Sequence, residues 1–156
     1  YAKGLLAHER TGLAGISRSL VALEKLRKQA GGVTRGNGSL LDDPSYRLKL
    51  AELEVELMAT EFTELRSLAS AAAGAEPGPE SSILKLKGTE IQQKIQKLTV
   101  EAGGIYSAAW GATPVGHTFA HGGMSGYLAS RAYTIYGGAS EVQRDVVAKN
   151  VLGLKK

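Results

Sequence analysis

Residues 43–73 read DPSYRLKLAELEVELMATEFTELRSLASAAA and carry the clearest helical pattern in the chain. The Asp43 carboxylate can cap the first amides of a helix, and Pro44 suits the first helical position because it lacks an amide hydrogen that would stay unpaired there. Apolar side chains then recur at steps of four and three residues, which places them on one helical face: Ala51, Val55, Met58, Phe62, Leu65 and Ala69. We expect this face to point into the core and the glutamates between its members to point away from it.

Two further segments have helical periodicity. Before residue 43, the spacing of Leu13, Ile16, Leu20 and Leu23 predicts a helix over about 2–29 that stops at the glycines 31 and 32. After the linker at 74–79, a helix is expected over about 79–102, with an inward seam of Leu84, Ile91, Ile95, Leu98 and Ala102. Gly88 lies inside this helix, where glycine costs about 1 kcal/mol relative to alanine.

The last third of the chain lacks the continuous helical periodicity of the first two thirds. Residues 103–126 are rich in glycine and predict a long loop, because they fit neither a helix nor an alternating strand. Helical pattern resumes over about 124–135 and over 140–152, where Ser140 and Gln143 have capping-box spacing and Gly153 suits the helix end. No segment predicts a strand. The expected fold is all-α, an antiparallel bundle of three long helices plus a shorter C-terminal pair, in one domain over 1–156.

Composition narrows the class of protein. The 156 residues have a net charge of +4 and no cysteine, which excludes disulfides, thiol nucleophiles and thiolate metal sites. No apolar run is long enough to cross a bilayer, so we expect a soluble, cytoplasmic protein. The basic residues are scattered rather than gathered with aromatics, which argues against nucleic-acid binding. The chain begins at Tyr1 rather than Met, which suggests a piece of a longer polypeptide.

One run carries a more specific signal. Residues 126–144, GYLASRAYTIYGGASEVQR, resemble the closing motif of the acyl-CoA dehydrogenase family. In family order, the resemblance extends to Glu9 and Arg10 in the first helix, to the Asp-Pro pair at 43–44, and to Gly103 and Gly104 after the third helix. It covers essentially the whole chain but only the C-terminal helical domain of the family, so the N-terminal helical domain and the β-domain are absent from this sequence.

The resemblance implies a flavoenzyme that removes a proton from the α-carbon of an acyl-CoA and passes a hydride from the β-carbon to FAD. It assigns the amide of Gly137 to the thioester carbonyl and Gly138 to the substrate. Ala139, Ser140 and Glu141 are expected to contact the flavin. The amides that open a helix at Ser140 suit such a role because they present donors and the positive end of a dipole.

The same resemblance implies where the catalytic base lies. Many family members carry a glutamate at the position of Gly137, and glycine cannot abstract a proton. A minority carry the base on the first helix, at the position matched by Glu9. We therefore expect Glu9 to be the base and Arg10 to lie near the substrate or orient the carboxylate, with His8 at the edge of the substrate cleft. The alternative is that Glu9 and Arg10 form a solvated surface pair.

The flavin assignments are less complete. Family resemblance places Gly103 and Gly104 in the cofactor site, where residues before the second helix and a glutamine ahead of the glycine pair help to bind the FAD of a neighbouring subunit. This sequence has Val100 in place of that glutamine and Gly36-Asn37-Gly38 in place of a Phe-Gly pair. The implied partners are acyl-CoA, the remaining domains, and other subunits of a homo- or heteromeric dimer or tetramer.

Two rival functions stay open at this point. One is a non-catalytic dehydrogenase-like subunit that completes the site of a partner, and the other is a free-standing helical interaction module. Metal binding is disfavoured, because His117 and His121 have helical metal-pair spacing in a glycine-rich segment without a third ligand nearby. Nucleotide binding through a P-loop is not indicated either.

Overall fold

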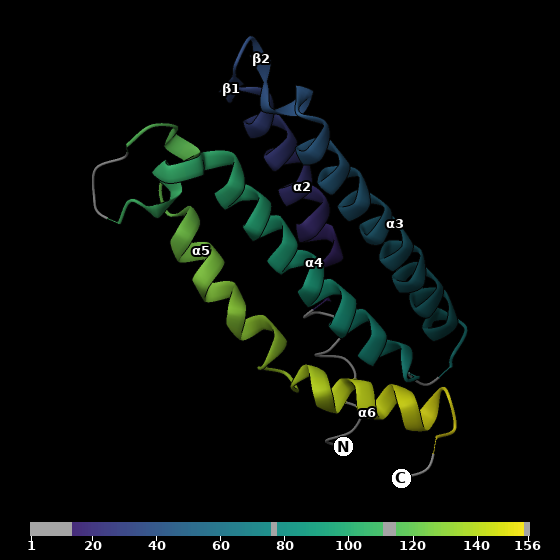
Figure 1. Ribbon diagram of the computed structural model, residues 1–156. Helices are drawn as coiled ribbons and strands as arrows, with labels where there is room; N and C mark the ends of the chain where they lie inside the picture. The colour runs from purple at the N-terminus through teal and green to yellow at the C-terminus, as the bar shows by residue number, and fades with distance from the viewer. Residues whose placement is uncertain (1–13, 76–77, 111–114, 155–156) are drawn as a thin grey trace.

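The computed structural model describes residues 14–75, 78–110 and 115–154. Four antiparallel helices lie side by side and a fifth lies across their lower ends (Figure 1): α2 (Ile16–Gly31), α3 (Pro44–Ala72), α4 (Glu80–Gly103), α5 (Gly123–Ala129) and α6 (Ser140–Asn150). Short 3-10 helices connect them: η1 (Leu40–Asp42), η2 (Gly104–Ala108), η3 (Thr118–Ala120) and η4 (Ser130–Thr134). The prediction of an all-α antiparallel bundle is confirmed.

A small hairpin corrects the expectation that the chain has no strand. Between α2 and α3, β1 (Thr34–Arg35) pairs antiparallel with β2 (Gly38–Ser39), with Thr34 opposite Ser39. Gly36 has a φ of +56°, which lets the two-residue connection turn sharply. Each strand has only two residues, so the alternation that predicts a strand cannot develop.

The start of α3 follows the sequence. The Asp43 carboxylate accepts hydrogen bonds from the backbone amides of Ser45 at 2.8 Å and Tyr46 at 3.4 Å, and Pro44 is the first helical residue. The predicted cap is therefore confirmed.

The inward face of α3 was predicted wrongly. The helix buries Tyr46, Leu50, Leu53, Leu57 and Thr60, whereas the predicted face points outward, with Val55, Phe62 and Leu65 exposed by 66%, 62% and 52%. Both faces repeat at helical spacing, and the face with the more regular repeat is the outer one. Periodicity alone cannot choose between two apolar faces of the same helix.

α4 is the central element of the fold. It packs against α2, α3, α5 and α6, and its predicted seam is buried as expected. One continuous core lies mainly between α2, α3 and α4, and it includes Ile16, Leu26, Leu40, Leu53, Leu84 and Ile91. α4 also contacts α5, η4 and α6, and the turn between η4 and α6 belongs to the candidate site described below.

The first predicted helix is interrupted at Gly15, and its part over 2–13 lies outside the described residues. Gly15 has a left-handed backbone with a φ of +58°, and α2 begins after it at Ile16. Ile16 and Leu23 are buried as predicted, and Leu20 is partly exposed. None of the described helices is long and apolar enough to cross a membrane.

Candidate functional site

The turn between η4 and α6 is the centre of the candidate site. Gly137 and Gly138 have φ values of +67° and +105°, in the left-handed region that favours glycine. Ala139 is the N-cap of α6 and provides no side-chain cap, so the first amides of the helix keep donors for an external acceptor. The predicted capping box of Ser140 and Gln143 is wrong, since the Ser140 hydroxyl instead donates to the Thr134 carbonyl at 3.4 Å.

One face of α4 connects this turn with the beginning of α2. The Lys85 amine donates a hydrogen bond to the Gly138 carbonyl at 2.8 Å, and the Gln92 amide donates to the Ala14 carbonyl at 2.9 Å. Gly88 lies between them in the sequence, at three- and four-residue steps that place all three residues on the same side of the helix. Two segments more than 120 positions apart in the sequence therefore meet on one short stretch of α4.

The glycine at 88 explains why these segments approach so closely. A Cβ atom built on Gly88 would collide with the Ala14 carbonyl oxygen and lie 2.6 Å from the Ala14 Cα. These are backbone atoms, so they cannot move aside as a flexible side chain would. Gly88 thus lets the backbone of Ala14, just before α2, touch the backbone of α4. This close contact explains why a residue of low helix propensity lies inside α4.

A groove of about 190 Å³ lies along α4 and includes Gln92 in its lining. It is lined from α2, α4 and η4 by Arg18, Ser19, Ala22, Gln92, Ile95, Gln96 and Tyr133. Near its edge, burial and the Tyr133 hydroxyl raise the pKa of Tyr136, while the guanidinium of Arg18 opposes the rise. The Tyr133 and Tyr136 rings meet edge to face, with centroids 5.7 Å apart. The groove is therefore an aromatic and amide-lined space with one cation on its α2 side.

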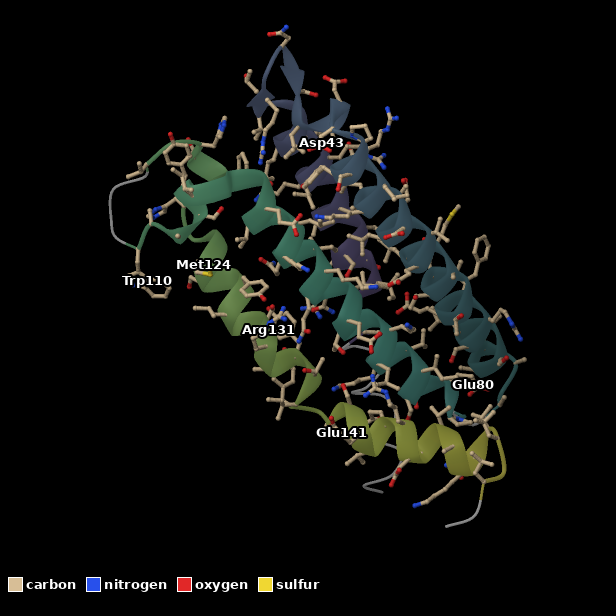
Figure 2. The ribbon with its side chains drawn as sticks, viewed as in Figure 1. Asp43, Glu80, Trp110, Met124, Arg131 and Glu141 are labelled. Carbon is tan, nitrogen blue, oxygen red and sulfur yellow. The ribbon has the colours of Figure 1, made fainter. Side chains whose placement is uncertain are left out.

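The structure brings part of the predicted site together. Gly137, Gly138, Ala139, Ser140 and Glu141 form one continuous turn and helix start, and Figure 2 shows Glu141 at the end of the bundle where α4 begins at Glu80. The predicted base Glu9 and its neighbours His8 and Arg10 lie outside the described residues. The segment that carries them leads into Ala14, whose backbone contacts Gly88 and Gln92.

Gly103 and Gly104 lie at the opposite end of α4. Lys85 and Gly103 are separated by 18 positions, which is about 27 Å along a helix. A Cβ atom on Gly103 would collide with the Ser107 hydroxyl, so this glycine has a packing role, whereas nothing lies within 4 Å of the corresponding position on Gly104. The structure therefore does not bring this pair to the turn at Gly137.

The two loop histidines do not form a pair on a helix. His117 stacks on Phe119, with ring centroids 5.5 Å apart, and His121 follows η3. Across residues 14–75, 78–110 and 115–154 no group of three or more His, Asp or Glu side chains could hold a metal ion.

Sequence reasoning did not place Lys85, Gln92 or Gln143 in the candidate site. Lys85 and Gln143 are both fully buried, although lysine is rarely buried without a partner. The Gln143 amide has no hydrogen-bond partner for either polar atom within the described part of the chain. In the sequence, Lys85 directly follows the predicted core residue Leu84 and precedes Gly88 by three residues. A lysine at the exposed edge of the core would have the same spacing, so the sequence alone does not predict that Lys85 is buried.

The family model described as "Acyl-CoA dehydrogenase, C-terminal domain" matches residues 1–152. Acyl-CoA dehydrogenase IpdE1 of Mycolicibacterium smegmatis is 30% identical over 119 residues, which cover 74% of this chain and 27% of the relative. Among solved structures, the Tcur3481-Tcur3483 steroid ACAD G363A variant has a TM-score of 0.80 and 25% identity, over 99% of this chain and 40% of that one. The ChsE4-ChsE5 complex from Mycobacterium tuberculosis has a TM-score of 0.72 and 23% identity, over 90% and 36%.

The chain belongs to the acyl-CoA dehydrogenase family and corresponds to its C-terminal domain. It spans about a quarter of the curated relative and about two fifths of the solved chains. The sequence resemblance carried by residues 126–144 is therefore confirmed.

Proposed function

We propose that this chain is the C-terminal helical domain of a flavin-dependent acyl-CoA dehydrogenase that oxidises acyl-CoA thioesters to 2,3-enoyl-CoA. Membership of the family supports an oxidoreductase role for the complete enzyme. The observation that carries the proposal is the shared face of α4, where Lys85 bonds to Gly138 and Gly88 meets Ala14. The turn assigned to the thioester and the end of the segment assigned to the base are anchored side by side.

The reaction divides between groups of this chain and a bound flavin. The Glu9 carboxylate takes the proton from the α-carbon, while the Gly137 amide donates a hydrogen bond to the thioester carbonyl and stabilises the negative charge that develops there. The chemistry that FAD supplies is acceptance of the hydride from the β-carbon. A double bond forms between the two carbons, so atoms and electrons balance without another reactant.

The residues at the start of α6 fit a flavin. Ala139 leaves the first amides of α6 without a side-chain cap, and these donors lie at the positive end of the helix dipole. An electron-rich ring atom is the kind of acceptor that such a site takes. Gly103 and Gly104, about 27 Å away along α4, cannot hold the same ring. Their assignment therefore requires a second flavin, held with a neighbouring subunit.

The backbone at residue 137 supports a base on another element. Gly137 has a φ of +67°, a conformation that is strained for a residue with a Cβ atom. The resemblance places a glutamate here in many family members, whereas this chain has a glycine with no side chain that could accept a proton. Placing the base at Glu9 leaves the turn free to serve as a set of backbone donors.

The substitution Glu9→Gln in the full-length enzyme, or in its complex, tests the proposal. It keeps the size of the side chain and removes its ability to accept a proton. We expect flavin content and acyl-CoA binding to persist while the rate of flavin reduction falls by about 10²–10⁴-fold. Stopped-flow absorbance of the flavin measures the rate. The control is Glu24→Gln, the same change on an exposed residue of α2.

The outcomes separate this function from its rival. Near-normal reduction by Glu9→Gln would overturn the base assignment. A wild-type complex whose acyl-CoA oxidation resides wholly in another subunit would instead show that this chain is the non-catalytic member of a pair, for which the glycine at 137 is the favouring observation.

We further propose that the enzyme is an oligomer in which a second dehydrogenase-like chain packs on the outer face of α3, defined as Val55, Met58, Phe62 and Leu65. Each of these side chains is more than half exposed, and their three- and four-residue steps suit a partner helix. Tcur3481-Tcur3483 and ChsE4-ChsE5 are assemblies of similar chains. Sedimentation velocity should show smaller species for Phe62→Glu and unchanged assembly for the control Val151→Glu. Unchanged assembly in both variants would place the interface elsewhere.

A further inference from the structure

Lys85 is the largest fully buried side chain in the described part of the chain. Its nitrogen lies 2.8 Å from the Gly138 carbonyl oxygen, 53 positions away in the sequence. Burial of a lysine amine is unfavourable unless its donors find acceptors. The Gly138 carbonyl is therefore one of the acceptors that make burial of this amine possible.

The carbonyl that Lys85 holds belongs to a residue with unusual backbone freedom. Gly138 has a φ of +105°, and glycine populates many conformations that other residues avoid. A Cβ atom on Gly138 would collide with the Gln143 side-chain nitrogen, so the turn lies directly on the first turn of α6. Gln143 itself is fully buried. The peptide after Gly138 is thus enclosed on the Gln143 side and bonded on the Lys85 side.

A planar trans peptide couples the two ends of this group. The Gly138 carbonyl and the Ala139 amide belong to the same peptide plane and point in opposite directions. A donor that fixes the carbonyl toward α4 therefore fixes the Ala139 amide away from α4. If the peptide rotated, this amide would point into the bundle and be lost to any ligand at the start of α6.

We propose that Lys85 is a positioning residue that prevents rotation of the peptide between Gly138 and Ala139 and so keeps the Ala139 amide directed at the flavin. This inference rests on the proposed function. Lys85 acts through the turn, because its amine donates a hydrogen bond to the Gly138 carbonyl. Loss of its donor should weaken a hydrogen bond to the flavin and slow hydride transfer, with a smaller effect on acyl-CoA binding.

The test compares three variants of the full-length enzyme. Lys85→Met removes the donor and keeps an unbranched side chain, and Lys85→Gln keeps a neutral donor. Lys94→Met is the matched control, because Lys94 lies on the same helix but forms an exposed ion pair with Glu56. Three measurements are made on each: hydrogen exchange of the peptide covering residues 137–143, the reduction potential of the bound flavin, and the rate of its reduction by acyl-CoA.

For Lys85→Met we expect amide exchange in 137–143 to speed up at least tenfold, the flavin potential to fall, and reduction to slow by about 10- to 100-fold with KM changed less than threefold. Lys85→Gln should recover part of each effect, and Lys94→Met should match the wild type. A purely structural role would lower the folded or flavin-loaded fraction without changing the potential of the flavin that remains.

The inference is overturned if Lys85→Met keeps the wild-type exchange rate, potential and reduction rate. Should that variant fail to fold, Lys85→Leu decides, because it also removes the donor, and wild-type values in all three measurements would overturn the inference as well. Failure of the proposed function looks different: the wild-type enzyme would not reduce flavin with any acyl-CoA, while the exchange measurement on residues 137–143 would still report whether Lys85 holds the turn.

Discussion

α3 and α4 differ in how much of each helix is buried. α4 buries twelve of its 24 residues and packs against four other helices, whereas α3 buries five of its 29. The sequence of α3 has the more regular apolar repeat, yet much of that repeat lies outside, while α4 takes serine, threonine and a lysine into the interior. In this chain, the buried polar residues of the central helix lie closer to the candidate site than the regular apolar repeat of α3 does.

The largest expected difference between the two helices is for the same substitution in each. Leu84→Ala removes a fully buried side chain of α4 and should lower the free energy of unfolding by about 2–5 kcal/mol. Leu65→Ala on the outer face of α3 should change it by at most about 0.5 kcal/mol in the dissociated protein. Urea unfolding at two protein concentrations measures both, because any larger loss for Leu65 should depend on concentration. Equal losses of unfolding free energy for the two variants at low protein concentration would contradict the expected difference between α3 and α4.

A smaller effect is expected where α4 touches α2. Gly88→Ala should lower stability by about 1–3 kcal/mol, because the new methyl group meets the backbone of Ala14 and overpacks the contact. The control is Gly126→Ala in α5, where the new atom meets only the end of the flexible Gln96 side chain. Thermal unfolding by circular dichroism compares the two. If Gly88→Ala were stabilising, helix propensity would outweigh packing at this crossing.

The contact between α3 and α4 also has a pH dependence. Burial, with a further contribution from Glu101, raises the pKa of Tyr46 well above its ordinary value of 10.0, and its hydroxyl donates to the Leu98 carbonyl at 3.0 Å. Because the folded state keeps the proton, this stabilisation is fully present below pH 10 and is lost as the pH rises above it. Tyr46→Phe should show a shallower loss of stability above pH 10 in denaturant titrations. Identical slopes for wild type and variant would contradict the assignment.

The smallest effect concerns the acidic flank of α3. Partial burial, and then Glu61, raise the pKa of Glu64 above its ordinary value, so ionisation is less favourable in the folded state. The stability that Glu64 gives in its protonated form is present below about pH 4.5 and is lost as the pH rises. Glu64→Gln should therefore stabilise the protein at pH 7, by at most about 0.5 kcal/mol. Glu52→Gln on the same helix is the control for removal of one negative charge. An equal gain in stability for both variants would mean that the effect comes from the lower net negative charge of the helix and not from the raised pKa of Glu64.

The predictable features are those encoded locally. The cap at Asp43 and the seam of α4 each depend on a few neighbouring residues, and the structure confirms them. The predicted helix end at Gly153 is too late, because α6 ends at Asn150 with Val151 as its C-cap. The inward face of α3 and the buried amine of Lys85 depend on what other segments place opposite them. The break at Gly15 was missed because an isolated glycine is tolerated inside helical patterns. Of the candidate site, the turn at 137–141 could be found by resemblance, whereas its support on α4 required the packing.

The spacing of the contacts on α4 has a consequence for changes in chain length. Lys85 and Gln92 lie seven residues apart, about 10.5 Å along the helix and nearly on one side of it. Lengthening the connection at 74–79 or the segment at 103–122 would leave that spacing intact. One residue inserted or deleted between 85 and 92 would rotate one contact by about 100° relative to the other and separate Gly138 from Ala14. Insertions and deletions among functional relatives are therefore expected in the connections and excluded from these two turns of helix.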